Sequence, residues 1–232
     1  MAEYIDLGEI RAAAYAQAGA GSVIYVHASK KDPEPVMALA GPLDSAVVWM
    51  EGAVWERDLT PWPAERAFRR GEDYTGGAGE YLQKLSDNMR KVEQALGINP
   101  VVRALVGYSL GGLFSLYCSY LTDAYPVIGS ISGSMWYDGF REYAASHTCR
   151  AKYVYISLGR GESHNKNPRF STVAESTGAV KEALEKNGVK TRFEWTGGDH
   201  RRMVHERIAA GLRAMDSAVK ALHLNINRSG GT

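Results

Sequence analysis

A serine between two glycines is the first feature of this sequence that could carry chemistry. The segment GYSLG, residues 107–111, follows the apolar run VVRALV and leads into the apolar run LFSLYCSYL. This succession predicts a strand, a sharp turn and a helix, the arrangement that exposes a nucleophilic serine at the end of a strand. The glycines leave room where a Cβ would crowd the neighbouring elements. We therefore predict that Ser109 is a nucleophile.

A serine hydroxyl needs a base to take its proton, and the base needs an acid to orient it. With the serine on such a turn, the expected chain order is serine, acid, histidine. His200 follows the last predicted strand in FEWTGGDHRR, at a loop tip where a base belongs. His147, His205 and His223 lie within or beside helical patterns. We predict that His200 is the base.

The acid is expected just after the strand KYVYISLG. Glu162, in GRGES, is the first carboxylate in that position, and we predict that it orients His200. Asp138, in SGSMWYDGF, comes one strand earlier and stays open as the alternative. Asp199 is next to His200 in the chain and is poorly placed to reach back to its ring.

An ester-cleaving serine also needs N–H donors for the oxyanion that forms in the transition state. The first is predicted to be the backbone N–H of Leu110, at the start of the helix after the nucleophile. The second should come from the loop after YVHAS, where Ser29 is our choice, with Ala28 beside it.

The elements that must position these residues alternate between strands and helices. Short apolar runs, such as AVVWMEG and PVIGSISG, end in glycine or small polar residues, and segments with helical periodicity lie between several of them. This pattern predicts an α/β fold with a mostly parallel central sheet covered by helices on both faces. IRAAAYAQ and SVIYVHAS, separated by AGAG, are predicted to form neighbouring strands of a short N-terminal hairpin.

The length of 232 residues predicts one domain over residues 1–223, followed by a flexible polar tail over residues 224–232. Lysine and arginine total 27 against 26 acidic residues, so the charge balance gives no support for a nucleic-acid or anionic-membrane partner. The spacing of the histidines makes no metal site with nearby acids or thiols, and we expect neither a metal nor a cofactor.

The start of the chain predicts a cytoplasmic protein. MAEYIDLGEI lacks the basic and apolar regions of an export signal, and no apolar run is long enough to span a bilayer. Cys118 and Cys149 are therefore expected to be reduced and largely buried.

Beyond these derivations, the chain resembles the Putative esterase family of the α/β-hydrolases, which includes esterase D, the enterobactin and salmochelin esterases and the mycolyltransferases. The resemblance runs from about Ile24 to Leu222. It rests on six segments: GYSLGG, RDLTPWP (57–63), GGAGEYL (76–82), SGSMWY (132–137), GRGE (159–162) and GGDH (197–200). By this match Ser109, Glu162 and His200 correspond to nucleophile, acid and base.

The resemblance also implies substrate contacts. Trp136 and Tyr137 would line an acyl or aryl pocket, with packing in the core as the alternative. Arg57 would lie near the mouth of the pocket, either on an anionic group or in an ion pair near Asp58. Independently of the resemblance, the placement of five basic residues in the acid and histidine loops predicts either a cationic rim of the site or a solvated charged face: Arg160, Lys166, Arg169, Arg201 and Arg202.

The sequence therefore predicts a serine esterase whose small-molecule substrate is a carboxylic ester, such as a siderophore or phenolic ester. An acyltransferase and a non-catalytic binding protein on the same scaffold remain the alternatives.

Overall fold

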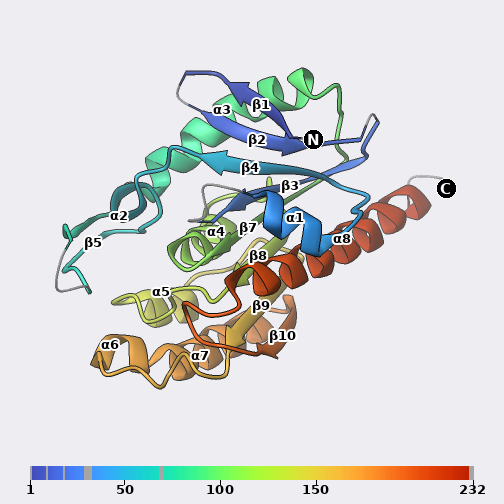
Figure 1. Cartoon of the computed structure of the whole chain (residues 1–232). Helices are drawn as coiled ribbons and strands as arrows, with labels where there is room; N and C mark the ends of the chain where they lie inside the picture. The colour runs from blue at the N-terminus through green and yellow to red at the C-terminus, as the bar shows by residue number, and fades with distance from the viewer. Residues whose placement is uncertain (1, 9, 18, 29–32, 68–70, 230–232) are drawn as a thin grey trace.

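The computed structural model describes residues 2–229, apart from residues 9, 18, 29–32 and 68–70. Figure 1 shows a twisted sheet through the middle of the molecule, with helices on both of its faces. This is the α/β architecture that the alternation of strands and helices predicts.

Eight strands of the described chain form the main sheet, in the order β1-β2-β4-β3-β7-β8-β9-β10. The strands from β4 to β10 in this order are parallel, whereas β2 is antiparallel to both β1 and β4. Their bounds are Glu3–Asp6 (β1), Arg11–Tyr15 (β2), Ser22–His27 (β3), Ala46–Glu51 (β4), Val102–Tyr108 (β7), Val127–Ile131 (β8), Tyr153–Gly159 (β9) and Lys190–Thr196 (β10). Pro63–Ala64 (β5) and Tyr74–Thr75 (β6) pair separately.

Both faces of the central strands are buried, which explains why their sequences are continuously apolar. Along β3, Val23 and Tyr25 belong to one hydrophobic core, whereas Ile24 and Val26 belong to the other. Successive side chains of a strand point to opposite faces, so each strand supplies both cores. The parallel sheet therefore needs a helical layer on each side.

Helices from both halves of the chain provide these layers. Buried side chains of α3, α4, α5 and α7 belong to the first core, and those of α1 and α8 to the second. The helix bounds are Glu34–Ala40 (α1), Trp55–Asp58 (α2), Ala78–Ala95 (α3), Leu110–Leu121 (α4), Phe140–Ser146 (α5), Pro168–Ser171 (α6), Val173–Lys186 (α7) and Val204–Ser229 (α8).

The predicted pairing of residues 10–17 with residues 22–29 is wrong. The N-terminal hairpin is formed by β1 and β2, and β4 lies between β2 and β3. The reversal of direction at AGAG is present, since β2 is antiparallel to β4 and β3 is parallel to it. All six residues of β3 are buried. Such a strand needs a neighbour on each side, and β4 and β7 fill these places.

The last helix of the described chain extends into the predicted tail. Helix α8 continues to Ser229, so residues 224–229 are helical, and the flexibility of this tail stays a prediction. No glycine or proline interrupts the chain between Gly211 and Gly230, and a helix that has formed can continue through polar residues. Leu224 and Ile226 are exposed on this extension.

Cys118 and Cys149 are buried, unpaired thiols, as expected. Among the helices of the described residues, none combines the length and apolar character required to span a membrane.

Candidate active site

Ser109 lies on a strained turn between β7 and α4. Its φ of 60° and ψ of −121° are rare for a residue with a side chain, and such strain is found mostly at functional sites. The turn is held from three sides, since the Ser109 carbonyl accepts hydrogen bonds from Gly112, Leu113 and Ser134. The backbone thus fixes the position from which the Ser109 hydroxyl projects.

The two glycines of the motif are required by close backbone contacts. A Cβ on Gly107 would lie 2.1 Å from the backbone of Gly111, and one on Gly111 would lie 2.2 Å from the His27 carbonyl oxygen. Strand β3 and the start of α4 therefore pack closely enough to exclude any side chain at these positions. This is the physical reason that the sequence pattern anticipates.

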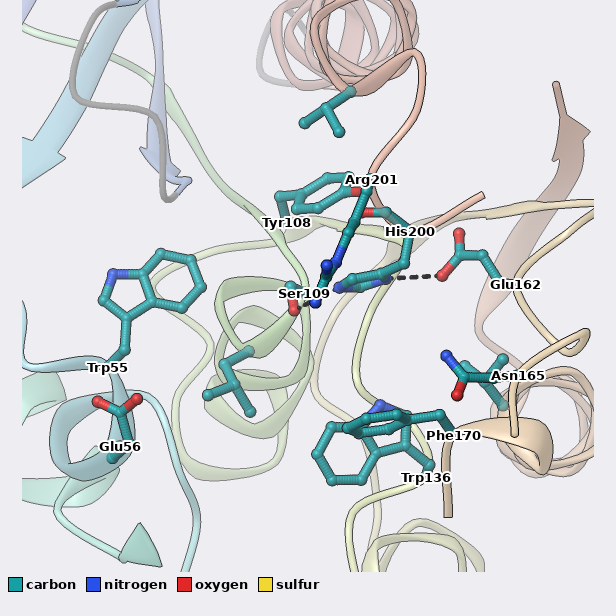
Figure 2. Close-up of a pocket in the computed structure, with 13 residues that line it drawn as sticks. Trp55, Glu56, Tyr108, Ser109, Trp136, Glu162, Asn165, Phe170, His200 and Arg201 are labelled. Atoms are coloured by element: carbon teal, nitrogen blue, oxygen red, sulfur yellow. Dashed lines mark hydrogen bonds and ion pairs between the residues drawn. The ribbon is translucent and has the colours of Figure 1, made fainter. Parts of the chain in front are cut away.

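His200 lies between Ser109 and Glu162, as Figure 2 shows. Its Nε2 is 2.9 Å from Ser109 Oγ, and its Nδ1 is 2.8 Å from Glu162 Oε2. An ionised carboxylate only accepts hydrogen bonds, so Nδ1 carries the proton in the neutral ring and Nε2 is free to accept from the serine hydroxyl. The Tyr108 hydroxyl donates to the His200 carbonyl at 2.9 Å and helps to hold this loop.

Glu162 is buried three residues after β9, and its Oε1 accepts a hydrogen bond from the Gly159 N–H at 2.8 Å. Burial raises the pKa of this carboxyl, but hydrogen bonding to His200 and the positive charges near it outweigh burial and hold the pKa below its ordinary value. The carboxylate is therefore ionised near neutral pH, as an acid that orients a histidine must be.

The alternative acids are engaged elsewhere. Asp138 Oδ2 accepts from Arg169 Nη2 at 2.7 Å. The Asp199 carboxylate accepts from the backbone N–H groups of Arg201 and Arg202. The structure thus brings Glu162, and neither alternative, to the His200 ring.

Arg207 is a charged neighbour of this site that no sequence motif indicates. It lies in the first turn of α8, is 2% exposed, and contacts the carboxylate of Glu162. One basic residue among the many charges of the last forty residues carries no signal of its own. Only the packing of α8 against the ends of β7 and β8 identifies Arg207 as a buried cation.

A cavity of about 560 Å³ opens at Ser109 and His200. Figure 2 shows Trp55 and Glu56 on one side of it, and Trp136 and Phe170 on the other. The rings of Trp136 and Phe170 meet edge to face, with centroids 4.8 Å apart. The remaining lining residues include Tyr108, Leu110, Glu162, Asn165, Val173, Arg201 and Val204. The walls are thus largely apolar and aromatic, with polar groups gathered near the serine.

Of the predicted substrate-binding residues, only Trp136 lines this cavity. Tyr137 is 2% exposed, and its hydroxyl donates to the Trp62 carbonyl at 2.6 Å, so it packs in the core. Arg57 is bonded to Asp58 through Nε at 2.8 Å and Nη2 at 3.2 Å. This is the ion pair that the sequence analysis considers as the alternative to an anion contact.

Of the two predicted oxyanion donors, the structure describes Leu110 but not Ser29. Leu110 is the first residue of α4, and among the described residues its N–H donates to no acceptor. It is therefore free to donate to a substrate oxygen in the cavity. Ser29 lies outside the described residues and stays a prediction.

The five basic residues do not form a common rim. Arg201 lines the cavity, whereas Arg160, Lys166, Arg169 and Arg202 do not. Arg169 is held by Asp138 and by the Glu65 carbonyl, and its guanidinium lies 5.5 Å from the centre of the Trp136 ring. Among the described lining residues, the charged side chains besides the proposed triad are thus Arg201 and, across the cavity from Ser109, Glu56.

Comparisons with known proteins identify the family of this chain. The sequence model of the family described as "Putative esterase" matches residues 44–210. The uncharacterized protein YbbA of Bacillus subtilis (strain 168) is 29% identical over 137 residues, which are 56% of this chain and 55% of that protein. The aligned part of the chain thus spans about half the length of this relative.

Two solved structures share the fold. An IroE-like serine hydrolase from Shewanella oneidensis has a TM-score of 0.74 at 17% identity, covering 92% of this chain and 79% of that one. The siderophore hydrolase EstB from Aspergillus nidulans has a TM-score of 0.69 at 16% identity, covering 94% and 95%. At such identities the likeness establishes the α/β-hydrolase fold.

Proposed function

Since the chain belongs to the Putative esterase family, we propose that it is a serine esterase that cleaves a carboxylic ester through an acyl-enzyme on Ser109. One observation carries this proposal: an unbroken line of hydrogen bonds runs from Ser109 Oγ through His200 to Glu162. A serine hydroxyl on a strained turn, a base within 2.9 Å of it and a buried ionised acid behind the base are the parts that acyl transfer requires.

The proposed reaction has two symmetric halves. Ser109 Oγ attacks the ester carbonyl carbon while His200 Nε2 takes its proton, and Glu162 stabilises the resulting imidazolium. The negative charge on the carbonyl oxygen is stabilised by the Leu110 N–H and by a second donor, for which Ser29 is the proposal. The imidazolium then protonates the leaving alcohol, and a water repeats the steps to release the carboxylic acid.

The cavity walls suggest the substrate class. Trp136 and Phe170 present aromatic surface beside the nucleophile, and Trp55 faces them. Flat or apolar groups pack well on such walls, which favours an ester with an aromatic or extended apolar part. The names of the similar structures, a siderophore hydrolase among them, support a siderophore or phenolic ester as the first class to test. The two free buried thiols favour the cytoplasm as the proposed compartment.

A fluorophosphonate probe tests the proposal directly, because it labels only an activated serine. We expect stoichiometric labelling of the full chain and none of Ser109→Ala. Ser134→Ala is the matched control, since Ser134 Oγ lies 3.4 Å from Ser109 Oγ without contacting His200, and this variant should still be labelled. Equal labelling of wild type and Ser109→Ala would overturn the assignment, and no labelling at all would favour a non-catalytic binding protein.

A panel of acyl and aryl esters then separates the remaining alternatives. Hydrolysis should be fastest for esters with an aromatic group, and water should be the acceptor. If added alcohols capture the acyl group in preference to water, the protein is an acyltransferase on the same scaffold.

A further inference from the structure

Arg207 is a buried cation that joins the segments carrying the two proposed partners of Ser109. Its guanidinium contacts the carboxylate of Glu162 and the hydroxyl of Ser132, and it donates to the carbonyl oxygen of Asp199 at 2.6 Å. It therefore ties α8 to the loop of Glu162, to the end of β8 and to the residue before His200. A buried arginine needs a partner for its charge, and here the partner is the same carboxylate that holds His200.

The two oxygens of Glu162 are divided between these neighbours. Oε1 accepts from Arg207 and from the Gly159 N–H, whereas Oε2 accepts from His200 Nδ1. The carboxylate cannot rotate without breaking one of these bonds. Its second oxygen is thus held toward the imidazole ring.

This division of oxygens has an electrostatic consequence. Glu162 and Arg207 form a buried pair with no net charge, so His200 faces a neutral pair rather than an isolated carboxylate. A cation beside Glu162 favours its ionised form and disfavours a second positive charge close to it. Both effects favour the state in which the imidazole is neutral and the carboxylate is ionised. They extend the pH range of this state toward lower pH.

Resting on the proposed function, we propose that Arg207 is a positioning residue that extends catalysis to lower pH by holding Glu162 ionised and aligned on His200. It does not touch the reacting atoms. Its influence passes through Glu162 and through its charge, which distinguishes it from a residue that merely supports the fold.

Tyr108 and Asp199, the other ionisable residues that Arg207 contacts among the described residues, keep their charge state near neutral pH. Burial raises the pKa of the Tyr108 hydroxyl, which faces Arg207 from β7, to about 12, so this group stays neutral. Backbone hydrogen bonds from Arg201 and Arg202 lower the pKa of Asp199, which stays ionised. The acid limb of kcat/KM is therefore expected to report on the Glu162–His200 pair.

The test compares the pH dependence of kcat/KM for wild type, Arg207→Gln and Arg207→Lys, using p-nitrophenyl acetate and the full chain. In Arg207→Gln the cation is lost, and the acid limb should move to higher pH by about one unit. Well down the wild-type limb, with each rate divided by its own plateau, this shift makes the variant roughly tenfold slower than wild type at the same pH. Arg207→Lys keeps the charge, so its limb should stay within about 0.3 units of wild type even if the plateau falls.

A limb that stays in place in a folded Arg207→Gln would overturn the proposal, because a purely structural role lowers the plateau without moving the limb. If Arg207→Gln does not fold, as judged by near-ultraviolet circular dichroism, Arg207→Met is measured in its place, because it also removes the charge while keeping an extended side chain: a limb that stays in place contradicts the proposal. Wild-type turnover that depends on Ser109 is measured first. Its absence would refute the proposed esterase function, whereas its presence with an unmoved limb would refute only the role of Arg207.

Discussion

At the scale of single residues, the proposed mechanism requires that Ser109 and His200 act as one unit. Ser109→Ala should leave the fold intact and lower kcat by a factor of about 10³ or more, and His200→Ala should be as damaging. The double variant should be no worse than either single one, because losing one member already removes the function of the other. Turnover of p-nitrophenyl acetate measures this, with circular dichroism as the check on folding.

The identity of the acid gives a second prediction at this scale. Glu162→Gln keeps the side-chain volume but removes the charge that stabilises the imidazolium, and it should lower kcat by about 10- to 10⁴-fold. Asp138→Asn is the matched control, because Asp138 is a half-exposed carboxylate bonded to Arg169 and not to His200. A larger loss in Asp138→Asn than in Glu162→Gln would show that the acid is on the other strand.

Residue types and spacing anticipated the contacts of Ser109, His200 and Glu162 because the serine turn indicates a fold, and that fold sets the chain order of the three residues. Arg207 could not be found in this way, since a buried arginine and an exposed one look alike in a sequence. Tyr137 illustrates the same limit: its neighbour Trp136 lines the cavity, but the Tyr137 hydroxyl bonds to the Trp62 carbonyl within the core. Which of two adjacent aromatic residues faces a cavity depends on how the turn after β8 packs.

At the scale of elements, the turn that carries Ser109 depends on how closely α4 and β3 pack. Gly111→Ala would place a Cβ 2.2 Å from the His27 carbonyl oxygen, so backbone must move. We expect a loss of at least about 2 kcal/mol in the free energy of unfolding, because neither element can shift without disturbing a packed core. Urea unfolding of the full chain measures it.

Gly178→Ala provides the comparison for this change. Gly178 lies inside α7, and a Cβ there would meet no atom within 4 Å. Alanine is the better helix former, so this substitution should raise the free energy of unfolding by roughly 0.5–1 kcal/mol. If both alanine variants behave alike, the close contact of the turn is not what requires glycine.

The pairing of the strands could not be predicted from the local sequence pattern. The AGAG turn predicts that the chain reverses direction, and it does, but a turn does not reveal which strand will fill the place beside β3. That place is taken by β4, more than twenty residues later in the chain. Likewise, the polar composition of residues 224–229 suggested a tail, although nothing in them interrupts a helix that has already formed.

At the scale of the whole molecule, the fold class, the helices on both faces and the family could be predicted because they depend on long, regular patterns. Runs of apolar residues recur through the chain, and the central strands they form bury both faces. Membership of the family rests on 167 matched positions, residues 44–210, and not on the serine motif alone. The distribution of charge is different, because it depends on side chains that the fold turns toward or away from one cavity.

The net charge of +1 leaves little long-range field, so any preference for a charged substrate must come from groups at the cavity itself. Arg201 lines the cavity beside Ser109, and among the described residues its guanidinium has no ion-pair partner. Arg201→Gln should therefore lower kcat/KM several-fold for aryl esters that carry a carboxylate or sulfonate, and change it little for neutral esters of equal size. Glu56→Gln, on the opposite wall, should have the reverse effect on the anionic esters.

Salt provides the control for this prediction, because exposed charges are screened within about 10 Å at 0.1 M salt. The advantage of the anionic ester should shrink at 0.5 M salt in the wild type and be small at any salt in Arg201→Gln. Arg160→Gln is the matched substitution: it removes the same charge from a residue outside the cavity lining and should leave the ratio of anionic to neutral turnover unchanged. If Arg160→Gln and Arg201→Gln lower that ratio equally, capture depends on the charge of the whole surface. If neither lowers it, the substrate group near Arg201 is neutral, and the aromatic walls alone select the ester.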